Sequence, residues 1–565
     1  MKILLKFISQ IIKRSFNLFF PILLCLTLFS PFHFACKKSN SKDLLTQDST
    51  IYSKFDFTSK HLDSHYIREF FNNHCNFQII ESELLSFYRR RDFQLAWYTD
   101  DGISESVQTF FDILREYNSL FNDTSFNIEK IEVILDSARL DSNYLIKNNE
   151  RIPQLELTLT SSFFIYAKKA YGGIDKDPKD LEWFIPRKKK DFNLLLNAVS
   201  TGRKDFNQFE PVNVYYKSLK FKLAELHRKE KELDSLRFNL IIIDNIPCPE
   251  MIKADMVWFE FLKIENDLEK LNCINLNDHI FLGIKNYQLR HGLKPTGNID
   301  SITFKLTQNP TQYYMEKMMV NLERLRWLSD TMPNEFILVN IPDFKMHVFD
   351  SSKLKWSCAV VVGKTIHQTS IFTGNLKHIV FSPYWSVPVS IANKEFLPKL
   401  KLDRQYLNKN DMELLSNGKV ISSSRIRWNQ YKTHMPFTIR QKPGKLNALG
   451  KVKFLFPNSY SIYLHDTPAK ALFSENRRDF SHGCIRVSEP LKLAQYLLRN
   501  DRKYNAQTIL GLTSKSNETW VNLAPTIPVL ILYLTTWVDS KGILNFRNDL
   551  YMHDQKLKNE IFIKR

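Results

Sequence analysis

The 565-residue sequence has few cysteines, and it has none of the close pairs that bind metal ions or build a disulfide framework. Its seven cysteines lie at positions 25, 36, 75, 248, 273, 358 and 484, with no C-x-x-C spacing. Five follow the first 36 residues, and because that number is odd, at least one thiol should stay free and no disulfide framework is expected. Cys75 and Cys358 lie among apolar residues and are predicted to pack in a core.

Long basic runs are also absent, although 79 Lys and Arg against 60 Asp and Glu give a formal net charge of +19. This excess predicts an anionic partner, such as a nucleic acid, a membrane surface or a cell-wall polymer. The notable basic runs, RRR at 89–91 and RKKK at 187–190, are short and typical of solvated loops. We therefore expect no nucleic-acid partner. A hydrophobic fraction of 43% predicts packed globular domains.

Residues 1–36 resemble an export segment. Basic residues up to Arg14 precede a nearly uncharged stretch that ends at Ala35-Cys36, before Lys37-Lys38. The pattern predicts a lipoprotein signal with a lipid on Cys36, an uncleaved signal anchor, or a cleaved secretion signal. All three place the rest of the chain outside the cytoplasm, and the first two attach it to a membrane. Residues 37–60 are polar, as expected of a tether.

Helical periodicity dominates residues 61–265, which are predicted to form a helical scaffold domain. Apolar residues recur at helical spacing in 155–174, which Gly172-Gly173 closes, and in 209–230. A smaller module is predicted at 270–310, with a helix that stops at Gly292 and a second helix capped near Asp300. Residues 311–334 are expected to form a connecting helix.

From Glu335 the hydrophobic period changes to two, which predicts strands. Asp350-Ser351-Ser352 marks a hairpin turn, and β-like runs follow at 376–381, 436–440, 452–464 and 527–534. We expect a mainly β domain over 335–545, with an insertion at 390–435 that covers a site, and a C-terminal tail at 546–565. The fold class predicted for the whole chain is therefore multidomain α+β.

The stretch HDTPAKALFSENRRDFSHGCIRV, residues 465–487, brings Cys484 close to two histidines. A cysteine attacks a carbonyl as the thiolate, so it needs an imidazole in hydrogen-bond reach and donors for the oxyanion. His465 ends an alternating strand and can approach from a neighbouring strand, whereas His482 is held two residues from the thiol. We therefore choose His465 as the base. Gly483 permits close backbone approach, so its amide and that of Cys484 are candidate oxyanion donors.

Other interpretations of this stretch stay open. Ser-His-Gly-Cys by itself is more often a turn than a site. A zinc site from His465, Asp466, His482 and Cys484 has acceptable ligand types but lacks the spacing of known zinc motifs, so we expect no metal and no cofactor. Papain-like proteases also pair Cys with His, but their cysteine opens a helix early in the chain.

Together with its surroundings, the stretch resembles the active-site signature of the L,D-transpeptidases with a YkuD-type catalytic domain. The matching motifs are Ser481-His482-Gly483-Cys484-Ile485-Arg486, Tyr463-Leu464-His465-Asp466-Thr467, Val362-Gly363-Lys364, Pro383-Tyr384-Trp385 and Asn447-Ala448-Leu449-Gly450. FYRRRDFQLAWYTDDG at 87–102 is similar to the scaffold of the large periplasmic branch, and 287–293 is similar to a three-helix peptidoglycan-binding module.

The resemblance implies acyl transfer between peptidoglycan stem peptides on the periplasmic side of the cell envelope. Cys484 would attack the third stem residue of a donor tetrapeptide and release D-alanine. An acceptor amine would then resolve the acyl-enzyme into a 3→3 crosslink. His465 carries over as the acid and base, oriented through the Asp466 backbone. The amides of Gly483 and Cys484 with the Tyr463 hydroxyl would bind the oxyanion.

The remaining site residues also follow from the resemblance. Arg486 would bind a stem carboxylate, Ser481 and Tyr384 would contact substrate, and His482 would have a structural role. Trp385 is a candidate wall of the cleft, with core packing as the alternative. Two other functions stay open: an L,D-carboxypeptidase that uses water instead of an amine, and a wall-binding scaffold without catalysis. Attachment of a lipoprotein to the wall is a further use of the same chemistry.

Overall fold

The structure, a computed structural model, describes residues 58–141, 143–200, 210–243, 258, 260–263, 265, 267 and 276–562. The expected export segment and most of the expected tether therefore lie outside the described residues. Within the described part, no helix has both the length and the apolar character needed to span a bilayer.

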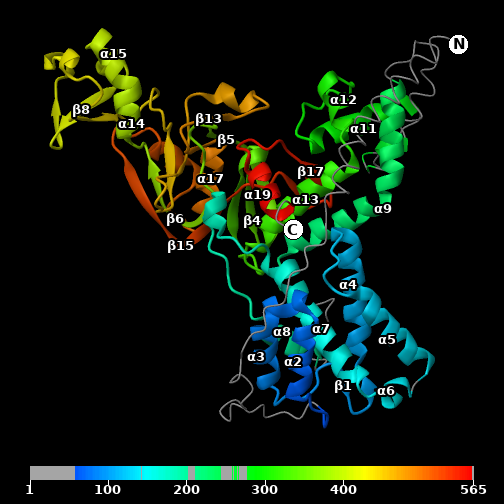
Figure 1. The fold of residues 1–565 in the computed structure, drawn as a ribbon. Helices are drawn as coiled ribbons and strands as arrows, with labels where there is room; N and C mark the ends of the chain where they lie inside the picture. The colour runs from blue at the N-terminus through cyan, green and yellow to red at the C-terminus, as the bar shows by residue number, and fades with distance from the viewer. Residues whose placement is uncertain are drawn as a thin grey trace. The chain divides into compact units, whose positions relative to one another are not determined.

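Two compact units make up the chain (Figure 1). Over the described residues, the first unit comprises 58–118, 123–165 and 192–200, and the second comprises the remainder. The scaffold that we expected as one domain over 61–265 is thus divided between them. The reason lies in buried contacts of the second unit: Arg326 donates to the Ala170 carbonyl at 2.9 Å, and Asn213 donates to the Leu325 carbonyl at 2.8 Å.

The first unit is helical, as predicted. Its helices are α2 (Ser64–Asn73), α3 (Glu81–Arg89), α4 (Glu105–Phe121), α5 (Ile128–Leu140), α6 (Tyr144–Lys147), α7 (Arg151–Ala167) and α8 (Phe192–Ser200), with a short hairpin of β1 (Tyr98–Thr99) and β2 (Gly102–Ile103). The buried Glu156 carboxylate of α7 accepts hydrogen bonds from the Tyr88 hydroxyl at 2.7 Å and from the Trp97 amide at 2.9 Å. Such satisfied polar groups fix how the helices pack.

Cys75 corrects the sequence analysis. It was expected to pack in a core, but it lies exposed at the start of η1 (Cys75–Ile80) and is disulfide-bonded. Cys358, in contrast, is a buried free thiol, as expected.

The second unit begins with helices that carry the predicted module. They are α9 (Val214–Ile243), α11 (Leu276–Arg290), α12 (Ser301–Thr307) and α13 (Thr311–Arg326). The predicted stop at Gly292 (φ +71°) and the predicted cap at Asp300, which accepts from the Thr303 amide, are both present. One face of α11, with Ile284 and Tyr287, packs against Leu233 of α9.

A nine-stranded sheet forms the centre of the second unit. Its strand order is β13-β5-β14-β12-β11-β6-β15-β3-β4, and β4 at one end also pairs with β5, the strand next to the other end. The strands are β3 (Phe336–Asn340), β4 (Lys345–Asp350), β5 (Lys353–Gly363), β6 (Phe372–Phe381), β11 (Val452–Leu455), β12 (Leu464–His465), β13 (Asp479–Ser481), β14 (Ile485–Val487) and β15 (Thr519–Leu532). Positive φ at Ser351 and Ser352 makes the predicted hairpin turn. The predicted run 452–464 is broken, because only its two ends are strands.

The insertion at 390–435 has a small core of its own. It contains α15 (Leu397–Leu402), α16 (Tyr406–Lys409), β8 (Met412–Ser416) and β9 (Lys419–Ile421), and its sheet order is β7-β10-β8-β9, with β7 (Trp385–Ser386) and β10 (Thr438–Gln441). Phe396, Leu400 and Trp428 are buried together. Because it has its own core, the insertion is a folded lobe and not a loose loop.

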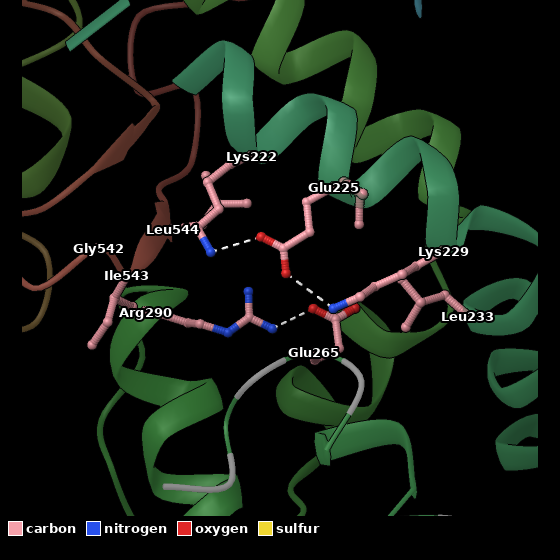
Figure 2. Close-up of a pocket in the computed structure, with 10 residues that line it drawn as sticks. Lys222, Glu225, Lys229, Leu233, Glu265, Arg290, Gly542, Ile543 and Leu544 are labelled. Carbon is pink, nitrogen blue, oxygen red and sulfur yellow. Dashed lines mark hydrogen bonds and ion pairs between the residues drawn. The ribbon is translucent and has the colours of Figure 1, made fainter. Parts of the chain in front are cut away.

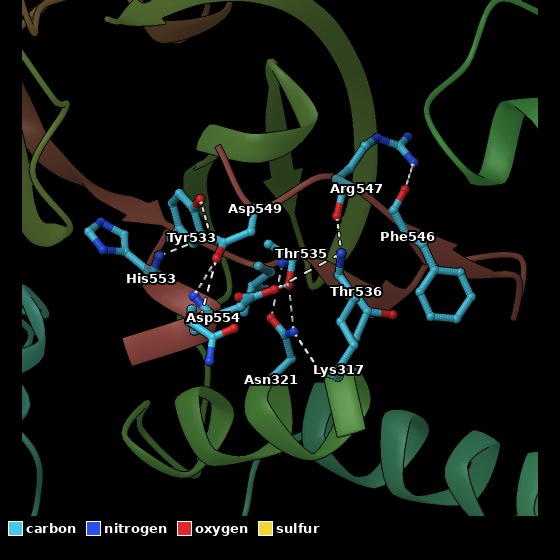
Figure 3. Close-up of polar contacts among 12 residues, drawn as sticks. Lys317, Asn321, Tyr533, Thr535, Thr536, Phe546, Arg547, Asp549, His553 and Asp554 are labelled. Carbon is cyan, nitrogen blue, oxygen red and sulfur yellow. Dashed lines mark hydrogen bonds and ion pairs between the residues drawn. The ribbon is translucent and has the colours of Figure 1, made fainter. Parts of the chain in front are cut away.

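The C-terminal segment corrects a second expectation. Residues 546–562 are not a tail, because α19 (His553–Phe562) follows a buried polar network (Figure 3). Asp554 accepts from Arg324 of α13 at 2.5 Å and from Thr535 at 2.7 Å. The Tyr551 hydroxyl reaches the Gly363 carbonyl at the end of β5, at 2.6 Å. Buried polar groups of α13 and β5 thus find their partners in this segment.

Candidate active site

Three adjacent strands bring the predicted cysteine and histidine to one face of the sheet. β12 and β14 run parallel, with Leu464 opposite Ile485 and His465 opposite Arg486. Leu464 and Ile485 are fully buried. Since successive side chains of a strand point to opposite faces, His465 and Arg486 lie on the other face, and Cys484 lies two residues before Arg486.

That other face lines a cleft of about 670 Å³. The insertion contributes Ile391, Lys394 and Glu395 to its wall. The sheet and its loops contribute His367, Ala448, Leu449, Lys453, Tyr460, Ser461, Tyr463, His465, Ser481, His482, Cys484 and Arg486, and Trp385, Ser386, Pro388 and Ser390 complete the lining. The insertion therefore borders the cleft.

The Cys484 thiol is held as a neutral donor. It donates to the Ser461 carbonyl at 3.5 Å. Burial raises the pKa of the thiol, while hydrogen bonds from Tyr463 and the positive charges of Lys453 and Arg486 oppose that rise. The protonated thiol is therefore the resting form at neutral pH, and a base is needed to generate the nucleophile.

His465 lines the same cleft and is held in one tautomer. Its Nδ1 lies 2.5 Å from the Asp466 carbonyl oxygen, and because a carbonyl only accepts, Nδ1 carries the proton and Nε2 is left as an acceptor. Burial, and after it the charge of Arg486, lowers the pKa of His465 to about 3. The imidazole is therefore neutral and able to take a proton. The Asp466 carboxylate is occupied by the Lys451 amide at 2.8 Å and by Lys470 at 2.5 Å.

In the turn before Cys484, the Gly483 amide does not have the direction expected of an oxyanion donor. Gly483 has φ +114°, which favours glycine, but its amide donates to the Ser481 hydroxyl at 3.1 Å and so is not directed at a substrate oxygen. Ser481 in turn donates to the Cys484 carbonyl at 2.6 Å. The side chain of Ser481 thus holds the turn, although the residue also lines the cleft. The Tyr463 hydroxyl was also expected to be an oxyanion donor. It lies beside the thiol group and hydrogen-bonds to it.

His482 contacts the insertion. Its Nε2 lies 2.7 Å from the Glu395 carboxylate, and its ring lies 5.2 Å from that of His367. This contact links the turn before Cys484 to the insertion at the edge of the cleft.

The two aromatic residues that were expected to contact substrate differ in their positions relative to the cleft. Trp385 is half-buried, lines the cleft and packs edge-on against Phe396 of the insertion core, so both interpretations of it hold in part. Tyr384 is outside the set of described residues that line the cleft; Arg440 stacks on its ring at 4.4 Å.

Three residues of the site gave no signal in the sequence analysis. Lys453 of β11 lies opposite His465 and lines the cleft. The buried Thr369 hydroxyl donates to the Gly483 carbonyl at 2.7 Å and accepts from the Gly363 amide at 2.9 Å, which fixes the turn from behind. Glu395 is the partner of His482. The alternation of KVKFLFPN would have indicated Lys453, because its neighbours Val452 and Phe454 are apolar.

The zinc interpretation finds no support in this geometry. No group of three or more His, Cys, Asp and Glu that could hold a metal ion occurs within the part of the chain that the structure describes. His465 and His482 instead direct a ring nitrogen to the Asp466 carbonyl and to Glu395.

Comparisons with known proteins agree with this site. Residues 334–529 match the family model of the L,D-transpeptidase catalytic domain, of YkuD type, and residues 82–223 match the model of a scaffold domain. A Haemophilus influenzae protein named "Putative L,D-transpeptidase" is 31% identical over 260 residues, which cover 46% of this chain and 52% of that protein. The chain thus spans about half the length of this curated relative.

Two solved structures are similar at 11% identity. The L,D-transpeptidase (Yku) from Stackebrandtia nassauensis gives a TM-score of 0.20, over 49% of this chain and 90% of that one. The Ldtfm–avibactam carbamoyl enzyme gives 0.15, over 36% and 51%. At these TM-scores neither structure supports an argument about this chain.

Proposed function

We propose that this chain works as the family that its residues 334–529 match, the L,D-transpeptidases of the YkuD type. It acts as a peptidoglycan L,D-transpeptidase, which forms 3→3 crosslinks between stem peptides through a cysteine acyl-enzyme. The observation that carries the proposal is the placement of Cys484 and His465 on one face of paired strands, with His465 fixed by the Asp466 carbonyl.

In the acylation step, the Cys484 sulfur attacks the carbonyl carbon of the third residue of a donor tetrapeptide. Nε2 of His465 takes the thiol proton as the sulfur–carbon bond forms, because both groups are neutral at rest. The tetrahedral intermediate then collapses, the carbon–nitrogen bond breaks, and the same proton passes to the nitrogen of the departing D-alanine. The Tyr463 hydroxyl supports the oxyanion.

In the second step, the amine of a neighbouring stem attacks the thioester. His465 accepts a proton from that amine and returns it to the Cys484 sulfur, so the enzyme ends as it began. Water in place of the amine gives a tripeptide and makes the enzyme an L,D-carboxypeptidase. The insertion borders the cleft, so its position controls which acceptor reaches the thioester.

The proposed location is the periplasmic side of the cell envelope, with the N-terminal segment as a lipid or signal anchor. The disulfide of Cys75 supports this location, because disulfides form and persist in oxidising compartments. The predicted segment itself lies outside the described residues.

Mass spectrometry of the products tests the proposal. The purified chain is incubated with disaccharide-tetrapeptide, beside a Cys484→Ala variant. A dimer that has lost one D-alanine, absent with the variant, is the expected result. Tripeptide without dimer would identify a carboxypeptidase. Neither product, from a folded chain, would contradict the catalytic assignment and favour a binding role.

A further inference from the structure

We propose that Lys453, with Arg486, binds the α-carboxylate of the residue that leaves the donor stem, so that acylation requires a free carboxylate on that residue. This inference rests on the proposed function. It adds a specificity-determining residue, Lys453, that neither the motifs nor the comparisons assign.

The strand register places the two cations on either side of the base. Lys453 of β11 lies opposite His465 of β12, and His465 lies opposite Arg486 of β14. Residues directly opposite each other on neighbouring strands have side chains on the same face, about 5 Å apart. Lys453, His465 and Arg486 therefore form one row across the sheet, and all three line the cleft.

Both cations lack a counterion among the described residues. Neither Lys453 nor Arg486 has a carboxylate within ion-pair distance in the part of the chain that the structure describes, and Nε of Arg486 is buried there without a hydrogen-bond partner. Burial lowers the pKa of both side chains. Glu518 attracts Lys453 only from farther away, since its carboxylate is engaged by the Tyr384 amide at 3.2 Å and the Trp520 ring nitrogen at 2.9 Å.

Lys453 and Arg486 are half-buried, and charges that are partly removed from water without partners are costly, so this arrangement favours an anionic ligand. Lys453 also lies over the Tyr463 ring at 4.8 Å, which holds the ammonium group near the thiol but does not neutralise it. A carboxylate that enters the row would pair with both cations and satisfy the free Arg486 nitrogen.

The chemistry of the leaving group selects which carboxylate this is. His465 must hand its proton to the amine nitrogen of the departing residue, so that nitrogen lies at His465 in the transition state. In an α-amino acid the carboxylate carbon is only about 2.5 Å from the amine nitrogen. The carboxylate of the departing residue is therefore brought to the groups that flank His465, and these are Lys453 and Arg486.

Two donor substrates distinguish carboxylate binding by Lys453 from a general effect of Lys453 on the reactivity of the thiol. One donor is the disaccharide-tetrapeptide with its terminal carboxylate, and the other has that carboxylate as the amide. Single-turnover acylation of Cys484 is followed by intact-protein mass spectrometry in the full chain, in Lys453→Gln and in Lys453→Arg. Lys451→Gln is the matched control, because Lys451 is an exposed cation just before the same strand and outside the cleft lining. Alkylation of Cys484 by iodoacetamide reports thiol reactivity in each variant.

We expect the unmodified chain to prefer the carboxylate donor by about 10- to 100-fold, the effect of one charged hydrogen bond. Lys453→Gln should slow acylation by the carboxylate donor by a similar factor and leave the amide donor unchanged. Lys453→Arg should retain part of the preference, and Lys451→Gln all of it.

Equal rates with both donors in the unmodified chain would overturn the inference and leave the proposed function in place. An equal loss for both donors in Lys453→Gln, matched by slower alkylation, would overturn it in favour of a role in thiol ionisation. No acylation of the unmodified chain by either donor, with normal alkylation, would overturn the proposed function and the inference with it.

Discussion

Two cavities of the second unit contain charged side chains that are buried or half-buried, and these charges are paired in one cavity and unpaired in the other. The cavity between α9, α11 and the turn before β17 (Leu544–Phe546) has a volume of about 90 Å³, and we call it the paired cavity (Figure 2). In it, Glu225 pairs with Lys222 at 2.8 Å and with Lys229 at 3.0 Å, and Arg290 pairs with Glu265 at 2.5 Å. In the catalytic cleft, by contrast, Lys453 and Arg486 face a much larger space without a counterion among the described residues.

The difference indicates which buried charges serve the fold and which serve a ligand. A buried cation that its own chain neutralises fixes the packing of the elements around it, and its loss is felt as instability. A buried cation that its own chain leaves unpaired weakens the fold slightly and is available to a substrate. Four predictions test this difference between the two cavities.

The largest effect is expected at the base. His465→Gln should slow acylation by about 10²- to 10⁴-fold, the contribution of a positioned acid and base, whereas His482→Gln should change it only a few-fold. The glutamine amide can still donate to the Asp466 carbonyl, so the loss reports proton transfer more than packing. Single-turnover acylation measured by mass spectrometry checks both variants. A larger loss in His482→Gln would reverse the assignment of the two histidines.

Arg290→Met should destabilise the fold without touching the chemistry. It leaves Asp267 buried without its cation and leaves Glu265 with Arg237 alone, which should lower the free energy of unfolding by about 3–5 kcal/mol. Iodoacetamide alkylation of Cys484 should keep its rate under native conditions. Lys453→Met is the matched change in the cleft, and it should leave the free energy of unfolding unchanged or higher. Denaturant unfolding measures both, and equal destabilisation by the two variants would abolish the contrast.

The pH dependence of stability should reveal that His465 stays neutral. Its pKa is about 3 in the folded chain, against about 6.5 for an unfolded histidine, so the unfolded state binds one more proton between these values. Stability should therefore fall as pH falls through this window, by at most about 1.4 kcal/mol per pH unit from this group. His465→Gln should remove that share of the slope. Identical slopes for the two proteins, from unfolding at several pH values, would show that His465 protonates normally in the fold.

The smallest effect is expected at the contact between the catalytic turn and the insertion. Glu395 and His482 are in close contact, at 2.7 Å, but both side chains are partly exposed, at 44% and 37%. Pairs of this kind contribute about 0–1 kcal/mol, so Glu395→Gln should shift the unfolding midpoint little. The ratio of crosslinked dimer to tripeptide is the sensitive measurement, because the insertion borders the cleft. A strong loss of stability would mean that the pair holds the lobe in place.

Much of the fold could be predicted from local patterns, and the exceptions have physical reasons. The helix stop at Gly292 and the turn at Ser351-Ser352 follow from local backbone preferences, which a sequence displays directly. The packed C-terminal segment was missed, because the polar residues that tie it in, such as Asp554, find their partners far away in the chain at Arg324. Cys75 was missed for a similar reason, since a disulfide depends on a distant partner and not on apolar neighbours.

The sequence by itself determined which residues are the candidates for chemistry, because several motifs that match one family lie around them. It indicated Cys484, His465 and the strands that carry them. Only the tertiary structure decided which groups surround them. The strand register places Lys453 and Arg486 on either side of His465. In the turn before Cys484, the Gly483 amide donates its hydrogen bond to the Ser481 hydroxyl. These placements arise from pairing between segments that are distant in the sequence. The residues next to a position along the chain therefore do not show which residues lie opposite it in the sheet.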